Sequence, residues 1–153
     1  MSVMGLRCFN EGFSCVVLQG NQQSPQLIMN DKYTFPVNLS WGGKLAWLRK
    51  QVFELLEQHE ITAVGMKSIE PIVRQKPSKR LEVEGVIKEA VHVSLGCDCT
   101  PRIKSQLKRD IADFTQTARY LGSVLTSRGL SLLNNDSFRD AALAAIAELP
   151  GQE

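Results

Sequence analysis

The chain has 153 residues, of which 43% are hydrophobic and 22% are charged, as is usual for soluble globular proteins. This length suits one domain, and we predict a single domain over residues 1–153. Eighteen Lys and Arg residues against 16 Asp and Glu residues give a formal charge of +2, too balanced to indicate a nucleic-acid or membrane-surface protein by charge alone.

Two short apolar runs open the chain, residues 3–8 and residues 13–19. The Asn-Glu-Gly sequence between them predicts an antiparallel β-hairpin in which Gly12 takes a positive φ. A third run at residues 26–29 is followed by residues 33–37, which form either a further strand segment or an extended loop. Pro36 argues against a central strand there.

From Gly43 to about His59, apolar residues recur at steps of three and four, which predicts an amphipathic helix. Residues 61–66 then form a short apolar run that is typical of a buried strand in a parallel sheet. A helix between two strands of one sheet predicts a crossover connection.

Residues 70–80 contain two prolines and four basic residues and predict an exposed loop. Ser78 is the predicted N-cap of the next helix, and residues 95–99 are the predicted fifth strand. Thr100 and Pro101 have the identities of a helix start. We expect the short basic helix that follows to carry Arg102, Lys104, Lys108 and Arg109.

Two more helices are expected near the end of the chain. Phe114, Ala118, Leu121 and Leu125 indicate the first, and an alanine-rich segment from about Ser137 to Leu149 indicates the second. Three antiparallel strands followed by right-handed crossovers predict an α/β fold, a mixed five-stranded sheet with helices on both faces.

Four segments in this order resemble the ribonuclease H-like fold and, within it, the RuvC-like Holliday-junction resolvases. Met4–Arg7 stands in the place of that family's Leu/Val-Gly-Ile-Asp, and Ala63–Lys67 in the place of its Val-Ala-Ile-Glu. Asp140–Ile146 is similar to its Asp-Ala-Ala-Asp-Ala helix, and Thr100–Lys104 is similar to its Thr-Pro-x-x-Val-Lys, one residue shorter. The resemblance spans nearly the whole chain and implies a ribonuclease H-like sheet.

The chain departs from the family where the family's chemistry lies. The resemblance implies two Mg²⁺ ions, held by carboxylates from the first strand, the fourth strand and the last helix. In this chain the two strand positions are Arg7 and Lys67, and only Asp140 is in register. Two cations at such a site repel Mg²⁺ by several kcal/mol at an effective dielectric constant of about 20. We therefore expect a degenerate active site with no catalysis and no cofactor.

Displaced carboxylates are the alternative. Glu70 follows Lys67 by three residues and Asp136 precedes Asp140 by four, so Glu70, Asp136 and Asp140 are the candidate ligands if Mg²⁺ is bound. Residues in such positions are more often solvated turn and helix-cap carboxylates.

Basic residues gather in the middle of the chain. Residues 67–109 include ten Lys and Arg and five Asp and Glu, whereas the segment before is neutral and the segment after carries −3. The resemblance places parts of this segment at the carboxyl ends of the strands, where open α/β sheets bind ligands. We expect a nucleic-acid-binding edge, with a merely solvated basic surface as the alternative. Its residues are Arg7, Lys67, Arg74, Lys76, Lys79, Arg80, Lys104 and Lys108.

No segment has the roughly 20 apolar residues of a membrane-spanning helix, and the first residues do not resemble a secretion signal. We expect a cytoplasmic protein with no membrane partner and four free cysteine thiols. The leading functional hypothesis is a non-catalytic protein that binds the backbone of DNA or RNA or acts as a scaffold. The alternatives are a divalent-metal nuclease with displaced acids and a homodimeric protein-interaction module.

Overall fold

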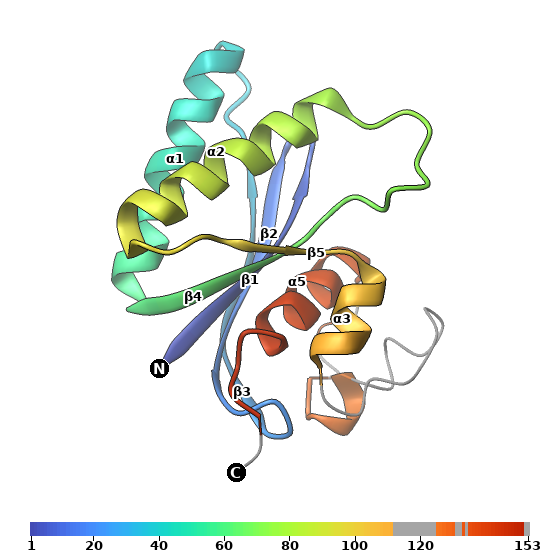
Figure 1. The fold of residues 1–153 in the computed structure, drawn as a ribbon. Helices are drawn as coiled ribbons and strands as arrows, with labels where there is room; N and C mark the ends of the chain where they lie inside the picture. Colours follow the sequence, from blue (N-terminus) through green and yellow to red (C-terminus); the bar gives the residue numbers. More distant parts are fainter. Residues whose placement is uncertain (112–124, 131–132, 134, 152–153) are drawn as a thin grey trace.

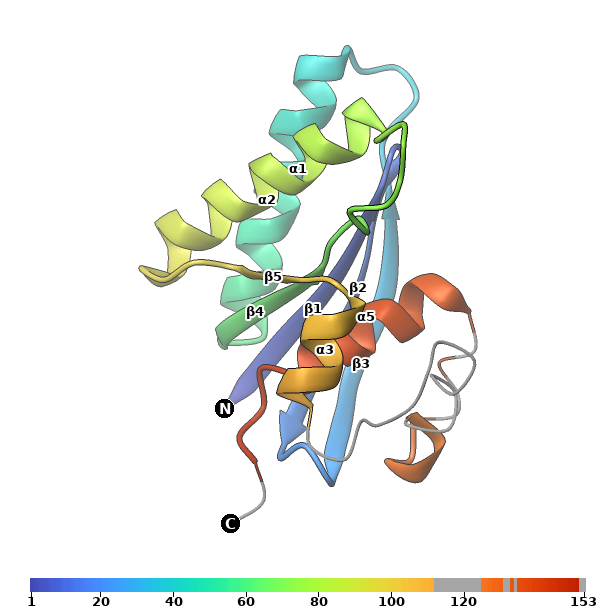
Figure 2. The same ribbon diagram turned by 45° about the vertical axis from the view of Figure 1, so that its right-hand side comes forward.

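The structure is a computed structural model that describes residues 1–111, 125–130, 133 and 135–151. Five strands form one mixed sheet in the order β3-β2-β1-β4-β5 (Figure 1). Helices α1 (Trp41–Gln58) and α2 (Ser78–Leu95) cover one face, while α3 (Lys104–Asp110) and α5 (Asp136–Ile146) lie on the other (Figure 2). The predicted fold class is confirmed.

The first half of the sheet is antiparallel. β1 (Ser2–Phe9) pairs with β2 (Gly12–Gly20), and β2 pairs with β3 (Pro25–Thr34). Gly12 has the predicted positive φ, 154°, and a Cβ there would lie 1.8 Å from the backbone oxygen of Tyr33. β3 is one continuous edge strand that ends before Pro36.

The second half of the sheet is parallel, as the predicted crossovers require. β4 (Ile61–Lys67) pairs with β1, and β5 (Thr100–Arg102) pairs with β4. The intervening α1 starts at Trp41 because the Ser40 side chain accepts a hydrogen bond from the Gly43 N–H at 3.1 Å.

Two predictions around α2 are wrong. Ser78 is the first residue of α2 rather than its N-cap, because Pro77 takes the cap position. The turn between β1 and β2 supplies a capping acceptor instead: Asn10 Oδ1 accepts the N–H of Arg80 at 3.1 Å. Residues 95–99 are not the fifth strand, because α2 continues to Leu95 and ends where Gly96 takes a φ of 72°.

The predicted helix start at Thr100 and Pro101 is also wrong, because both residues lie in β5. The edge position of β5 tolerates a proline, which lacks an N–H for the ladder. Arg102 likewise belongs to β5, where it is 8% exposed and lies 2.8 Å from Asp110 and 3.1 Å from Glu148. The helix predicted around residues 114–121 lies outside the described residues.

Helix α5 lies directly on the backbone of the sheet. Gly5 of β1 and Gly65 of β4 are register partners beneath it. A Cβ at Gly5 would lie 1.8 Å from the Ala141 oxygen, and one at Gly65 would lie 2.4 Å from the Ala144 oxygen. Side chains two residues further along each strand point to the same face, so this packing directs them towards α5.

Candidate functional site

The site begins with two basic residues at the carboxyl ends of adjacent strands. Arg7 of β1 and Lys67 of β4 are register partners, and each follows one of the two glycines under α5 by two residues. Arg7 Nε lies 3.5 Å from Oδ2 of Asp140, which α5 supplies. The structure thus brings together the three positions at which the resemblance implies metal ligands.

A cavity of about 200 Å³ opens beside Lys67. Lys67 Nζ donates a hydrogen bond to the Ser68 carbonyl oxygen at 2.8 Å and lies 3.8 Å from Oε2 of Glu70. The Glu70 carboxylate also accepts the backbone N–H of Lys104 at 3.2 Å. Asp140 and Lys104 line the same cavity, so two carboxylates and two half-buried lysines surround it.

Burial dominates the electrostatics of this site. It raises the pKa of Asp140 above its ordinary value, against the opposing charges of Lys67 and Arg7. It also lowers the pKa of Lys67, against the opposing charges of Glu70 and Asp140. Both groups are therefore poorly hydrated and depend on each other for charge compensation.

A divalent cation does not fit this set of donors. Mg²⁺ binds carboxylate, carbonyl and water oxygens, whereas Arg7 and Lys67 present positive charge, and Asp140 already contacts Arg7. Within the described ranges, no three His, Cys, Asp or Glu side chains are grouped so as to hold a metal ion. Positive side chains thus occupy two of the three places where the family has metal ligands.

The displaced acids are only partly brought together. Glu70 and Asp140 line the same cavity. The Asp136 side chain is 97% exposed. Its Oδ1 forms an ion pair with Nη1 of Arg139 at 3.6 Å within the first turn of α5. Asp136 therefore behaves as the solvated helix-start carboxylate that the sequence allowed for.

Arg80 contacts the site through the backbone of β4. Its Nη2 donates to the carbonyl oxygen of Lys67 at 3.2 Å, and its Nε donates to Glu84 at 3.0 Å. Glu84 is 4% exposed and was not among the predicted site residues, although Glu four residues after Arg is the spacing of a helical ion pair. Arg80 therefore fixes the end of β4, and most of its side chain is covered.

The other predicted ligands carry charges that no carboxylate compensates among the described residues. Arg74 and Lys76 are exposed in the loop between β4 and α2, and Lys79 is exposed at the start of α2. Lys104 lines the cavity at the start of α3, and Lys108 is half-buried further along that helix. In the part of the chain that the structure describes, none of the five forms an ion pair. Their role as nucleic-acid ligands stays a prediction.

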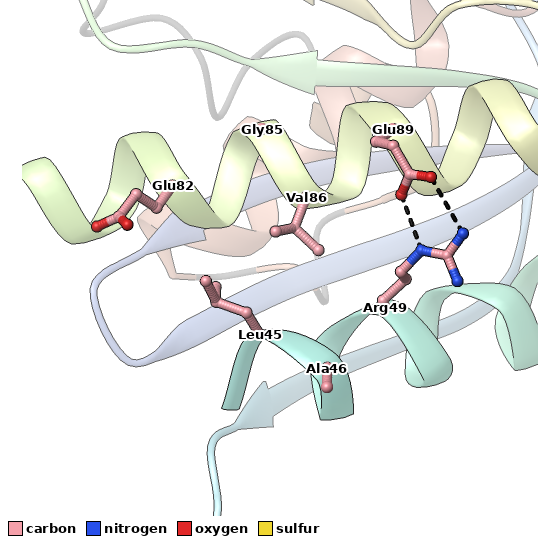
Figure 3. Close-up of a pocket in the computed structure, with 7 residues that line it drawn as sticks. All are labelled: Leu45, Ala46, Arg49, Glu82, Gly85, Val86 and Glu89. Carbon is pink, nitrogen blue, oxygen red and sulfur yellow. Dashed lines mark hydrogen bonds and ion pairs between the residues drawn. The ribbon is translucent and has the colours of Figure 1, made fainter. Parts of the chain in front are cut away.

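A separate, largely apolar groove of about 470 Å³ runs between α1 and α2 (Figure 3). Leu45 of α1 and Val86 of α2 face it, and an ion pair of 2.8 Å between Arg49 and Glu89 bridges it. The groove belongs to the helix layer rather than to the strand ends, and nothing in the structure identifies an occupant.

Two further expectations concern the cysteines and membrane-spanning helices. The four cysteines are free thiols, as predicted. In the residues that the structure describes, no helix combines the length and the apolar character needed to cross a membrane.

Comparison with models of protein families finds no match, and neither does comparison with curated proteins. Solved structures do match. RuvC of Thermus thermophilus superposes with a TM-score of 0.76 at 15% sequence identity, over 96% of this chain and 92% of RuvC. The same protein in complex with a Holliday junction substrate gives 0.74 at 17% identity, over 96% of this chain and 91% of RuvC.

The likeness extends to a eukaryotic resolvase. The yeast mitochondrial Holliday junction resolvase superposes with a TM-score of 0.60 at 14% identity, over 95% of this chain and 76% of the yeast chain. At these identities the likeness concerns the fold, and it agrees with the strand order and the helix layers described above. The chain has the ribonuclease H-like fold, in the arrangement found in RuvC and other Holliday junction resolvases.

Proposed function

We propose that this protein binds the phosphate backbone of nucleic acid at the carboxyl ends of β1 and β4 and does not hydrolyse it. The observation that carries the proposal is the pairing of Arg7 with Lys67 at the positions of the expected metal ligands. Where two Mg²⁺ ions would contact a phosphate, the chain presents a guanidinium and an ammonium.

The two cations suit a phosphate for a physical reason. Arg7 faces the Asp140 carboxylate and Lys67 faces the Glu70 carboxylate, and burial keeps Lys67 partly dehydrated, so a phosphate oxygen competes with little water at Lys67. The Arg7 side chain is 30% exposed, so part of it faces solvent although its Nε is buried beside Asp140. A phosphate diester can thus be held by charge with no nucleophile being activated.

The exposed basic residues would extend this contact along the backbone. Arg74 and Lys76 follow β4 along the chain and Lys79 lies at the start of α2, while Lys104 and Lys108 lie on α3, whose first residue lines the cavity beside Lys67. Contacts of this kind position a protein on nucleic acid without reading its sequence. Arg80, which is bound to Glu84, acts in this proposal as a positioning residue for β4.

DNA is the favoured partner in this proposal. One of the structures that this chain resembles is Thermus thermophilus RuvC in complex with a Holliday junction substrate. A branched DNA is therefore the first substrate to test, with duplex DNA and duplex RNA beside it.

The test measures binding and cleavage in the same samples. Labelled four-way junction, duplex DNA and duplex RNA are titrated with the protein at low salt, and the strands are then resolved on a denaturing gel after incubation with Mg²⁺ or Mn²⁺. We expect binding that weakens steeply with salt and strands that stay intact. Absence of binding at low ionic strength would refute the proposal.

A matched pair of variants locates the contact. Arg7→Gln with Lys67→Gln removes the two central charges, whereas Lys50→Gln with Lys88→Gln removes two charges that are exposed on α1 and α2. Backbone binding at the proposed site requires the first pair to weaken binding by at least tenfold and the second pair to leave it nearly unchanged.

A nuclease with displaced acids is the second candidate, because Glu70 and Asp140 line one cavity. It requires cleavage that depends on Mg²⁺ or Mn²⁺ and that Asp140→Asn abolishes. Cleavage with these properties would replace the first proposal.

Cytoplasmic localisation and a homodimeric interaction module stay predictions. The apolar groove between α1 and α2 is the feature that a protein partner would cover. The mass measured by light scattering tests the homodimer directly.

A further inference from the structure

Another hollow lies where the turn between β1 and β2 meets the starts of both long helices. Figures 1 and 2 show that α1 and α2 begin at the same end of the sheet, next to this turn. The hollow has a volume of about 280 Å³. Its lining mixes aromatic, charged and polar side chains: Asn10, Glu11, Thr34, Phe35, Val37, Trp41, Lys44 and Lys79.

Trp41 gives this hollow a flat aromatic wall. Its ring lies 5.6 Å from the Phe35 ring, edge to face, and Phe35 in turn contacts Trp47 of the core. The indole is thus held in place from one side. Its Nε1 is buried and has no hydrogen-bond partner among the described residues, so the ring rather than the N–H is the part available to a ligand.

Two lysines make the rim of the hollow positive. Lys79 Nζ lies 5.3 Å from the centre of the Trp41 ring, and Lys44 lines the hollow from the first turns of α1. Neither helix has an acidic residue in its first turn, so the positive ends of both helix dipoles add to this charge. Glu11 is the carboxylate that lines the hollow.

Such a lining matches a nucleotide. A base can stack on an indole and hydrogen-bond through its ring edge, while its phosphate needs cations close by. The carboxylate of Glu11 can accept from an exocyclic amine or an imino N–H. The volume lies just below the roughly 300–1,000 Å³ of pockets for drug-sized ligands, which suits one base and does not suit a base pair.

We infer that this hollow binds the base of one unpaired nucleotide, with Trp41 as its stacking surface and Lys44 and Lys79 on its phosphate. An entering base displaces the Lys79 ammonium from the ring, and the ammonium then faces the phosphate. The inference deepens the proposed function, since it makes the ligand a nucleic acid that contains unpaired nucleotides.

A short chain of hydrogen bonds links the hollow to the proposed backbone contact. Asn10 lines the hollow and also accepts the N–H of Arg80, whose side chain binds the carbonyl oxygen of Lys67. In this proposal, a strand held at Arg7 and Lys67 places an unpaired base in the hollow.

The indole N–H resonances of the two tryptophans test the inference in the whole chain. Thymidine 5′-monophosphate, thymidine and inorganic phosphate are titrated separately while these resonances are followed by NMR, with Trp41→Phe used for assignment. We expect the monophosphate to shift the Trp41 resonance and thymidine to do so more weakly. The Trp47 resonance serves as the internal reference, because Trp47 does not line the hollow.

Variants separate stacking from charge. Trp41→Leu should weaken binding of an oligothymidine at least fivefold, as loss of one base–aromatic stack does. Lys44→Gln should weaken binding of the monophosphate but not of thymidine, and Lys50→Gln is the matched control on α1. Thermal unfolding of each variant shows whether the fold is kept, and the Lys44 result stands alone if Trp41→Leu does not fold.

Three outcomes overturn the inference: no shift of Trp41 with the monophosphate, equal shifts of both tryptophans, or the same shift with phosphate alone. Duplex or junction DNA bound by Arg7 and Lys67, with binding of the oligothymidine unaffected by Trp41→Leu, would overturn the nucleotide pocket and leave the proposed function standing. Binding of the monophosphate without salt-dependent binding of duplex or junction DNA would support the nucleotide pocket and overturn the proposed function.

Discussion

The salt dependence of DNA binding can be worked out from the basic residues that have no carboxylate partner. Arg7 and Lys67, the central contacts of the proposal, already face carboxylates, so a phosphate there exchanges one anion for another and adds little to the slope. Arg80 is likewise bound to Glu84. Five residues of the same edge have uncompensated charges in the described structure: Arg74, Lys76, Lys79, Lys104 and Lys108. If each neutralises one phosphate, a plot of the logarithm of the association constant against that of the salt concentration has a slope of about −4.5 for duplex DNA.

This slope corresponds to a large change in affinity. Raising monovalent salt from about 50 mM to about 200 mM should weaken binding about 500-fold. Arg74→Gln with Lys76→Gln removes two of the five contacts, which reduces the slope to about −2.7 and the weakening to about 40-fold. Fluorescence anisotropy of end-labelled duplex DNA, measured at four or more salt concentrations, gives both slopes.

The control keeps net charge constant between variants. Lys50→Gln with Lys88→Gln lowers the charge of the chain by the same amount from the helix layer, and its slope should remain that of the natural chain. A natural slope near zero, or equal slopes for the two double variants, would show that these loop residues do not meet phosphates.

Three further predictions concern the packing of α5 on the sheet, the ion pairs of Asp110 and the charges of the site. Gly5→Ala should lower the free energy of unfolding by about 3 kcal/mol in urea denaturation, because its Cβ would lie 1.8 Å from a backbone oxygen of α5. Gly85→Ala in α2, where a Cβ meets nothing within 4 Å, should raise it by about 0.5–1 kcal/mol. Asp110→Asn should lower stability by about 2 kcal/mol at neutral pH. The difference should shrink as the pH falls below 3.8, because hydrogen bonds from two arginines hold the pKa of Asp110 far below that ordinary value, and protonation removes the stabilisation. Arg7→Asp with Lys67→Glu should create a site that Mn²⁺ stabilises by about 2.7 kcal/mol at a hundred times its Kd, whereas Mn²⁺ should leave the natural chain unchanged in thermal unfolding.

Each of these measurements has a result that contradicts its reasoning. Equal stability of the Gly5 and Gly85 variants would mean that α5 does not lie on the β1 backbone. A pH-independent loss for Asp110→Asn would mean that its carboxylate is not ionised against arginine in the folded chain. Mn²⁺ binding by the acidic double variant should be lost on adding Asp140→Asn; if it persists, the metal binds elsewhere.

Periodicity and turn chemistry predicted the first hairpin, the parallel strand β4 and the two long helices, but not the bounds of the fifth strand. Gly12 indicated the first hairpin because the chain needs a positive φ there. The apolar stripe from Leu45 to Leu56 indicated α1, and the run at residues 61–66 indicated a parallel strand. The convergence of Arg7, Lys67 and Asp140 was predicted because the resemblance assigns all three to one site.

What the sequence did not predict depends on partners that are distant along the chain. Ser78 has the identity of an N-cap, yet α2 takes a capping acceptor from Asn10, nearly 70 residues earlier. Arg102 was expected on a helix surface, but its partner Glu148 follows 46 residues later and holds it in an edge strand. The hollow at Trp41 likewise lies between a hairpin turn and two helix starts, and no local sequence pattern predicts that these segments lie close together.

Because the register of β1 against β4 places Arg7 beside Lys67, replacing Asp140 has a different effect on the charge balance of the site from replacing either cation. Removing either cation still leaves the carboxylate of α5 with an opposite charge nearby. Removing Asp140 leaves Arg7 with no carboxylate among the described residues, next to another cation on the neighbouring strand. An anion arriving from solution would then restore the lost balance, so Asp140→Asn should make the folded chain depend on phosphate or sulfate in its buffer.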